Sequence, residues 1–226
     1  MSVEVKSARP TRIENVFALE TGEGEWLATL CKSEPSGSTE DAIEHEGRYY
    51  RPWSPATSKL SSMLLKGMPV PLKPHSRVLY LGAASGTTVA HVSDIVTDGI
   101  VFAVEFAPRP ARDLLRVIAG RENVVPVIAD ARRPEQYPPF IDHADLLYQD
   151  VAQPDQADIA IANADRYLEA GGHAVIAIKA RSISAAGDAK DIFAKEIERL
   201  SERFEIVDKV SLEPLHRDHL AVLCRY

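Results

Sequence analysis

The first feature that could do chemistry is a turn of small residues, Gly82-Ala83-Ala84-Ser85-Gly86-Thr87-Thr88, between an apolar run and a helix-like segment. Small residues let a ligand approach the backbone, and the N-terminus of the following helix offers free N–H groups. The spacing of Gly82 and Gly86 is neither the GxGxxG dinucleotide motif nor a phosphate-binding P-loop, because no Lys precedes Thr87. The turn therefore favours S-adenosylmethionine (SAM), which has no phosphate to bind. A tight turn without a ligand is the alternative.

Three acidic residues follow three consecutive strand-like runs. Glu105 comes 19 residues after Gly86, where an acid can accept hydrogen bonds from ribose hydroxyls, and Phe106 beside it can pack against an adenine ring. Asp130 and Asp150 end the next two runs. Each acid alone is typical of a helix cap or a loop. Because the carboxyl ends of parallel strands meet at one edge of a sheet, the three together favour a cofactor site at that edge.

Two lysines and a histidine could carry a reaction at the same edge. Lys179 closes a fifth apolar run, on the side of Asp150, although a lysine there can also simply reach solvent. Lys59 lies near the start of a predicted helix. If Thr57 rather than Ser54 is the N-cap, the Lys59 charge opposes the helix dipole, which hints at a role; a solvated side chain is the alternative. His219 begins the last strand-like run, and a lone histidine is more often structural than catalytic.

Strand-like and helix-like segments alternate from Arg77 to the end of the chain. Strands are predicted at 78–81, 100–104, 124–128, 144–148, 172–178, 205–212 and 219–224, and helices at 87–96, 111–119, 156–169 and 189–204. This alternation is typical of an α/β fold in which helices cover both faces of a mostly parallel sheet.

Residues 1–52 have a different pattern. Short β-like runs at 13–19, 26–31 and 47–50, with a hairpin turn at 21–24, predict a small antiparallel β unit. A helix follows, with Ser54 as its expected N-cap, Pro55 as its first residue and Gly67 at its end. We therefore predict a small antiparallel β domain over residues 1–54 and a second domain over residues 55–226.

Composition limits the class of protein. The 226 residues are 45% hydrophobic and 26% charged, which excludes disorder of the whole chain. The 33 Asp and Glu outnumber the 26 Lys and Arg, for a net charge of −7, which argues against a protein that binds nucleic acid through its overall charge. Apolar runs are too short to span a membrane and the N-terminus does not resemble a signal peptide, so we expect a cytoplasmic protein. Cys31 and Cys224 are far apart, so we expect no metal site.

Taken together, the motifs resemble those of archaeal-type fibrillarin, a family of guide-RNA-dependent RNA 2′-O-methyltransferases. The motifs that carry the resemblance are, in chain order, Arg51-x-Trp53-x-Pro55-x-x-Ser58-Lys59-Leu60, the turn at 82–88, Glu105-Phe106, Asp130-Ala131-Arg132, Asp150-Val151-Ala152-Gln153, Lys179-Ala180-Arg181-Ser182 and Arg217-Asp218-His219. The resemblance covers nearly the whole chain. It implies a Rossmann-like SAM-dependent methyltransferase fold, with a mostly parallel seven-stranded sheet and a small N-terminal β domain.

The resemblance also implies site residues. The family's catalytic Lys-Asp-Lys-His set falls on Lys59, Asp150, Lys179 and His219. With the small residues of the turn, the expected SAM site comprises Gly82, Ala83, Gly86, Thr87, Thr88, Glu105, Phe106, Asp130, Ala131, Asp150, Val151, Ala152 and Gln153.

The partners that the resemblance implies are a box C/D guide RNA, a target rRNA or tRNA, a Nop-domain scaffold protein and a kink-turn-binding protein, with no membrane partner. Since the guide chooses the nucleotide, no base-reading motif is needed, and the sequence has none of the RRM type. Three alternatives remain: a nicotinamide-dependent oxidoreductase, a non-guided small-molecule or RNA methyltransferase, and a non-catalytic subunit that keeps the fold.

Overall fold

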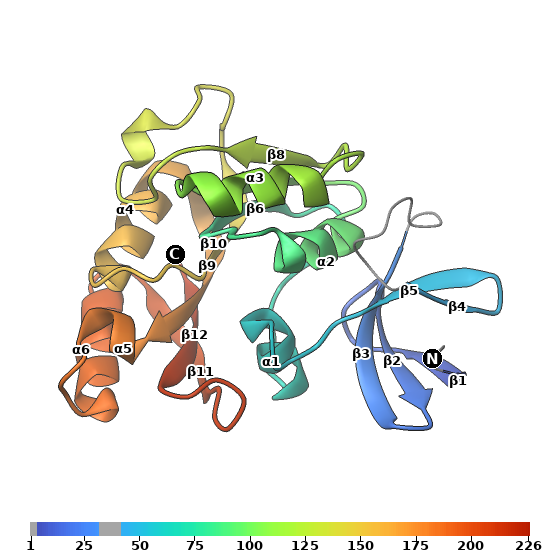
Figure 1. The fold of residues 1–226 in the computed structure, drawn as a ribbon. Coiled ribbons are helices and arrows are strands. Elements are labelled where there is room, and N and C mark those ends of the chain that lie inside the picture. Colours follow the sequence, from blue (N-terminus) through green and yellow to red (C-terminus); the bar gives the residue numbers. More distant parts are fainter. Residues whose placement is uncertain (1–3, 32–41) are drawn as a thin grey trace.

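The computed structural model describes residues 4–31 and 42–226, which contain two β-sheets (Figure 1). The first sheet is antiparallel, with the order β1-β2-β3-β5-β4. Its strands are β1 (Val5–Pro10), β2 (Val16–Thr21), β3 (Gly24–Leu30), β4 (Ile43–His45) and β5 (Arg48–Pro52). The sequence predicted β2, β3 and β5 with shifted ends but missed β1 and β4. Both missed strands lie at the sheet edges and bury no residue fully, so they lack a hydrophobic pattern.

The second sheet has seven strands in the order β11-β12-β10-β9-β6-β7-β8. They are β6 (Arg77–Leu81), β7 (Ile100–Val104), β8 (Val124–Val127), β9 (Ala144–Gln149), β10 (Leu168–Lys179), β11 (Glu205–Ser211) and β12 (His219–Arg225). Five strands are parallel, and β12 runs antiparallel to β10 and β11. The predicted mostly parallel seven-stranded sheet is confirmed. The carboxyl ends of the parallel strands meet at one edge, which is where the site lies.

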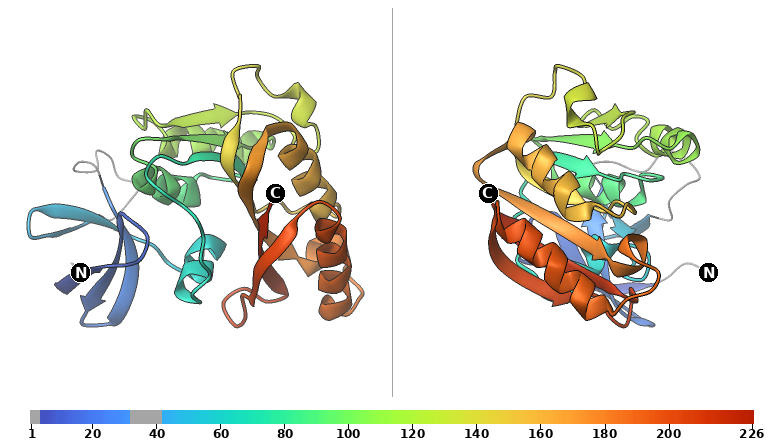
Figure 2. Two further views of the ribbon diagram at one scale, coloured as in Figure 1. Left: turned by 180° about the vertical axis from the view of Figure 1, so that it is seen from behind. Right: turned by 90° about the vertical axis from the view of Figure 1, so that its left-hand side faces the viewer.

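Helices cover both faces of this sheet (Figure 2). They are α1 (Lys59–Leu65), α2 (Thr87–Ile95), α3 (Pro108–Val117), α4 (Gln156–Tyr167), α5 (Ala180–Ile183) and α6 (Ala189–Ser201), with a 3₁₀ turn η1 (Pro134–Gln136). Val78 and Tyr80 of β6 pack in one hydrophobic cluster with α1, α2 and α3, whereas Leu79 and Leu81 pack in another with α4 and α6. Within the described ranges, no helix is both long and apolar enough to cross a membrane.

The first helix begins later than predicted. Its N-cap is Ser58, whose Oγ accepts a hydrogen bond from the Ser61 N–H at 3.3 Å, and not Ser54. The residues after Ser54 form a turn instead, in which the Ser58 N–H donates to the Ser54 carbonyl at 3.1 Å. Lys59 is therefore the first residue of α1, at the positive end of its dipole. The structure also adds α5 and η1, and ends α4 at Tyr167, where β10 follows directly.

A buried polar network joins the first sheet to α2. Asp94 on α2 accepts hydrogen bonds from Arg51 Nε at 2.8 Å, from Arg121 Nη1 at 2.7 Å and from Thr29 Oγ1 at 2.9 Å. His91, one turn earlier on α2, is 2.9 Å from Thr29 Oγ1 through its Nδ1. Its ring also stacks on that of Trp53, with centroids 4.6 Å apart. Because Trp53 precedes α1, the network fixes the chain that leads to Lys59.

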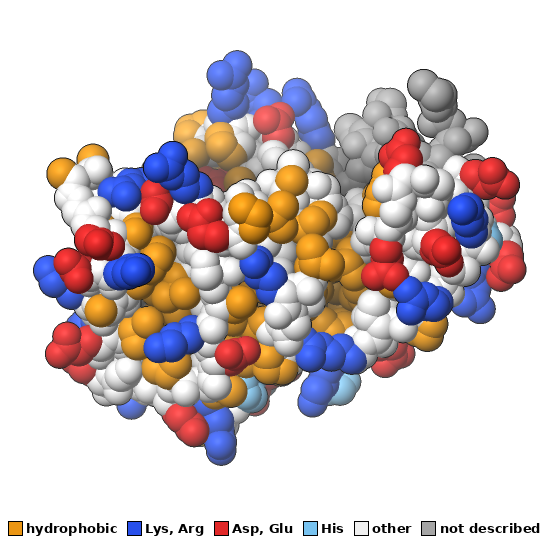
Figure 3. Space-filling view, turned by 90° about the horizontal axis from the view of Figure 1, so that it is seen from below, with side chains coloured by type: hydrophobic (Ala, Val, Ile, Leu, Met, Phe, Trp, Pro, Cys, Tyr) orange, Lys and Arg blue, Asp and Glu red, His pale blue; other side chains and the backbone are white. Residues whose placement is uncertain are grey.

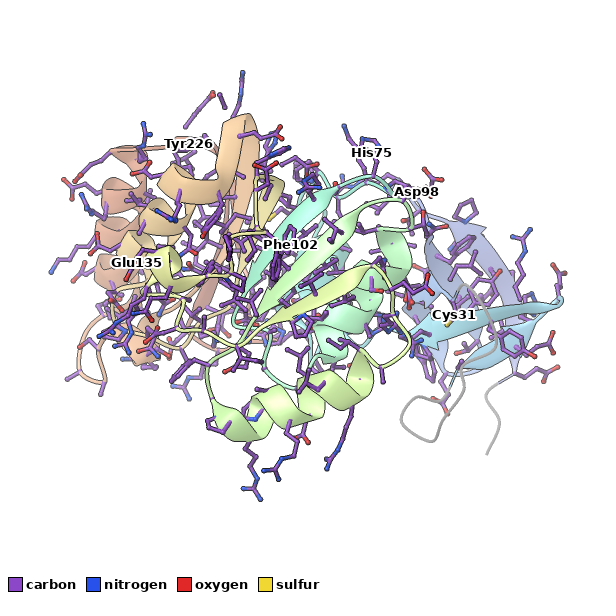
Figure 4. The ribbon with its side chains drawn as sticks, turned by 90° about the horizontal axis from the view of Figure 1, so that it is seen from above. Cys31, His75, Asp98, Phe102, Glu135 and Tyr226 are labelled. Atoms are coloured by element: carbon purple, nitrogen blue, oxygen red, sulfur yellow. The ribbon has the colours of Figure 1, made fainter. Side chains whose placement is uncertain are left out.

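Replacing Asp94 with Ala is expected to lower the free energy of unfolding by about 3–5 kcal/mol, because it removes the buried carboxylate that accepts hydrogen bonds from Arg51, Arg121 and Thr29. Urea unfolding measures the change. Asp98→Ala is the matched control: Asp98 lies just beyond the same helix, is exposed (Figure 4), and should cost less than about 1 kcal/mol. Equal effects of the two substitutions would contradict this account of the network.

Candidate functional site

A pocket of about 320 Å³ opens at the carboxyl edge of the parallel strands, within the size range of small-molecule sites. The residues that line it come from the ends of β6, β7, β8, β9 and β10: Gly82, Ala84, Val104, Glu105, Phe106, Ala129, Asp130, Ala131, Asp150, Val151, Ala152, Gln153 and Lys179. The structure thus brings together nine of the predicted cofactor residues. Ala83, Gly86, Thr87 and Thr88 lie outside this lining, and their predicted contacts with a cofactor stay predictions.

The backbone of the small-residue turn requires glycine at two positions. Gly82 has a φ of +81°, and a Cβ there would lie 2.9 Å from the Asp150 carbonyl oxygen. Gly86 caps α2 with a φ of +88°, and a Cβ there would lie 2.8 Å from Leu114 Cδ1. Gly82 therefore lets the turn pass close to the strand end that carries Asp150, whereas Gly86 lets α2 pack against α3.

Gly82→Ala is expected to weaken SAM binding by at least about tenfold, because a positive φ and a close backbone contact both oppose the new methyl group. Calorimetric titration with SAM measures this. Gly120→Ala is the matched control, since Gly120 has a φ of +82° with nothing within 4 Å of the added Cβ. A Gly82→Ala protein that binds SAM as tightly as Gly120→Ala would contradict the role given to the turn.

Glu105 and Asp130 supply carboxylates to the pocket. Glu105 is nearly buried, and its two oxygens accept hydrogen bonds from the Ala84 N–H at 2.9 Å and the Ala107 N–H at 2.8 Å. It therefore ties the turn to the start of α3, and each oxygen keeps capacity for a ligand hydroxyl. The hydrogen bond from Arg132 to Asp130 lowers the pKa of Asp130, so this carboxylate is ionised at neutral pH. Half-exposed Phe106 offers an aromatic surface beside them.

Three charged residues meet at the pocket. Asp150 lies between two lysines, with Oδ1 at 2.7 Å from Lys179 Nζ and Oδ2 at 3.2 Å from Lys59 Nζ. Lys179 Nζ also donates to the Asp150 carbonyl at 2.8 Å. All three side chains are less than one-fifth exposed. Both Asp150 and Lys179 line the pocket, so the cluster can reach a group held there.

Burial and charge set the ionisation of this cluster. Burial lowers the pKa of Lys179 from its ordinary value, the Lys59 charge lowers it further, and the Asp150 carboxylate opposes both. The pKa of His219 is also lowered, first by burial and then by the charges of Lys59 and Lys179. His219 is therefore neutral at neutral pH.

His219 faces Lys179 across the β10–β12 pair, where the two residues are register partners. Its Nδ1 lies 2.6 Å from the Arg217 carbonyl, which can only accept, so Nδ1 carries the proton and Nε2 is left as an acceptor. Among the described residues, the ring makes no hydrogen bond with Lys59, Asp150 or Lys179. The structure thus places His219 beside the charged cluster and outside the residues that line the pocket.

Gln156 is a site residue that the sequence analysis missed. Its fully buried amide accepts from the Lys179 N–H at 2.9 Å and donates to the Lys179 and Gln153 carbonyls at 3.2 and 2.8 Å. It therefore fixes the backbone of Lys179 against the segment that follows β9. A polar residue at the start of a helix is usually a surface residue, so only its tertiary contacts reveal this role.

The arrangement suits a reaction at a weakly acidic hydroxyl. Ammonium groups can hold such an oxygen and stabilise the negative charge that develops on it, and the neutral imidazole nearby can accept a proton. In the described part of the chain, no group of three or more His, Cys, Asp or Glu is placed to hold a metal ion.

Comparison with known proteins finds the same architecture elsewhere. A family model described as fibrillarin matches residues 8–226. The fibrillarin-like rRNA/tRNA 2′-O-methyltransferase of Methanosarcina barkeri is 50% identical over 190 residues, which cover 82% of this chain and 84% of that protein.

Two solved structures are similar over almost the whole chain. Aeropyrum pernix fibrillarin in complex with natively bound SAM has a TM-score of 0.89 and 42% identity, covering 98% of this chain and 99% of the other. The fibrillarin chain of a fibrillarin/Nop5p complex has a TM-score of 0.84 and 39% identity, covering 94% and 98%.

Proposed function

Since this chain belongs to the fibrillarin family, we propose that it is a SAM-dependent RNA 2′-O-methyltransferase that acts on rRNA and tRNA as a subunit of a box C/D particle. The observation that carries the proposal is the Lys59–Asp150–Lys179 cluster at a pocket built from the Gly82 turn and the acids of neighbouring strands. The oxidoreductase alternative has no support in these relatives.

The residues of the pocket fit SAM. The Gly82 turn allows close approach, Glu105 and Asp130 supply acceptors for hydroxyl or amino groups, and Phe106 supplies a surface for an aromatic ring. When bound, SAM supplies an activated methyl group on a positively charged sulfur. Since no phosphate must be bound, the acidic lining is favourable.

The chain's own groups prepare the ribose hydroxyl. A 2′-hydroxyl is a very weak acid, so Lys179 is proposed to hold its oxygen and stabilise the negative charge that develops on it. Asp150 keeps Lys179 in place and balances the Lys59 charge. His219 lies beside this cluster, and its unprotonated Nε2 can accept a proton. The main contribution is orientation, because the hydroxyl must lie in line with the methyl group.

The proposal extends to the particle. The fibrillarin/Nop5p complex supports a Nop-domain partner, and we propose that guide RNA and a kink-turn-binding protein complete the assembly. A net charge of −7 is unsuited to strong RNA binding by the chain alone, so partners would hold most of the RNA. The cytoplasmic location expected from the sequence stays a prediction.

Transfer of labelled methyl from SAM to a guide-matched RNA, with and without the partner proteins, tests the proposal. We expect 2′-O-methylation only in the complete mixture. In a separate binding titration of the chain, we expect SAM to bind and NAD not to bind. Methylation of free RNA by the chain alone would contradict the dependence on partners. No methylation in the complete mixture, despite SAM binding, would contradict the activity.

A further inference from the structure

One face of α3 carries three exposed arginines, Arg109, Arg112 and Arg116, which we call the arginine face. Their i, i+3, i+7 spacing aligns them along the helix over about 10 Å, at 1.5 Å per residue. The opposite side of α3 packs into the core through Ala111 and Leu114. In Figure 4, side chains with nitrogen tips project from the outer side of α3, away from the sheet.

Most of this positive charge has no acidic partner among the residues that the structure describes. Arg116 pairs with Asp113 at 3.0 Å, in an exposed i, i+3 pair. Arg109 and Arg112 form no ion pair with any residue of 4–31 or 42–226. By contrast, acidic and basic side chains are interspersed over the underside of the molecule (Figure 3). A locally positive helix face is therefore unusual in a chain whose net charge is −7.

The arginine face begins at the pocket. Glu105 and Phe106 line the pocket, and Glu105 accepts the Ala107 N–H directly before α3. Arg109 follows as the second residue of the helix. The face thus extends outward from the rim of the site, on the element that follows the cofactor-binding strand.

We infer that the arginine face binds backbone phosphates of the RNA whose ribose is presented to Lys179, an inference that rests on the proposed function. An RNA strand that places one hydroxyl at the pocket must continue past its rim on both sides, and its phosphates must lie against whatever forms that rim. Guanidinium groups bind phosphate with paired hydrogen bonds and do not read bases. Since pairing with a guide supplies the sequence information, a base-independent contact is what this position requires.

The test compares Arg109→Gln/Arg112→Gln with a control, Arg48→Gln/Lys195→Gln, which removes two exposed charges from the first sheet and from α6. Binding of the full chain to an RNA duplex of about 20 base pairs is measured by fluorescence anisotropy between about 25 and 150 mM salt. The arginine double variant should bind RNA about 5- to 30-fold more weakly at the lowest salt. The slope of the logarithm of its binding constant against the logarithm of salt concentration should fall by the amount expected for about two phosphate contacts. The control should stay within about twofold of the wild type.

Two results would overturn the inference. Equal losses in the two double variants would assign the effect to overall charge. Unchanged RNA binding with lost binding of a Nop-domain protein would make the face a protein-docking surface. Thermal unfolding of each variant confirms that it is folded. RNA binding is measured without methyl transfer, so this test is separate from the proposed activity. A wild-type chain that binds RNA through the arginine face but methylates no RNA would contradict the proposed activity and leave the inference standing.

Discussion

Lys179→Met should reduce methyl transfer to a guide-matched RNA by at least about 1000-fold and leave SAM affinity within about threefold. The side chain lies at the pocket with its ammonium 2.7 Å from Asp150, so its loss removes the group that would hold the reacting oxygen. Methionine keeps most of the apolar stem and therefore the packing. Single-turnover transfer of labelled methyl, together with calorimetric titration of SAM, separates the chemical step from cofactor binding.

Lys195→Met is the matched control for this substitution. Lys195 is exposed on α6, away from the pocket lining, so the variant should transfer methyl at the wild-type rate. Activity of Lys179→Met within about tenfold of this control would remove Lys179 from the mechanism. Loss of SAM binding in Lys179→Met would instead make Lys179 a cofactor-binding residue.

Asp150→Asn is expected to lower methyl transfer by about 100- to 1000-fold. The substitution keeps the shape of the side chain but removes the negative charge that lies between Lys59 and Lys179. The two ammonium groups would then repel each other without a shared partner, and Lys179 would lose the contact that fixes its position. Asp142→Asn is the matched control. Asp142 is exposed and precedes the first residue of β9, whereas Asp150 follows the last, so this variant should transfer methyl at the wild-type rate.

The pH dependence of Asp150→Asn distinguishes two roles for Lys179. Asp150 raises the pKa of Lys179 against the lowering effect of burial, so its removal lowers that pKa further. If protonated Lys179 stabilises the oxygen, activity is lost as pH rises through this pKa. In Asp150→Asn the loss should therefore begin at a lower pH than in the wild type. Residual activity that instead appears at a lower pH would show that the neutral amine acts as the base.

Much of the site could be predicted from strand ends. Glu105, Asp130, Asp150 and Lys179 each close an apolar run, and parallel strands bring their carboxyl ends to one edge because each crossover returns the chain to the same side. Five of the strands are parallel and the pocket lies at that edge, so these four residues line it together. This inference required only the local pattern and the fold class.

Other features depend on contacts between segments that are distant in the sequence. Lys59 meets Asp150 from the first position of α1, directly after the N-cap Ser58. The sequence did not reveal this start, because Ser54 is equally suitable as an N-cap by residue type but lies in a turn instead. Gln156 binds the backbone of Lys179 from the start of a helix, and His91 stacks on Trp53 between the two sheets. Side-chain periodicity reports which face of an element is buried, but not which residue it is buried against.

The sequence by itself therefore determined the strands of the second sheet, its longer helices, the edge that binds the cofactor and, through its motifs, the resemblance to a methyltransferase family. Only the tertiary structure decided that Lys59 and Lys179 share the Asp150 carboxylate and that backbone N–H groups bind both Glu105 oxygens. It also decided that Arg109 and Arg112 have no acidic partner in residues 4–31 and 42–226. The physical reason is the distance along the chain over which each kind of interaction acts. Hydrophobic periodicity and turn chemistry act between neighbours in the chain, whereas the pKa of Lys179 and the free charge on α3 depend on groups that the fold brings within a few ångströms.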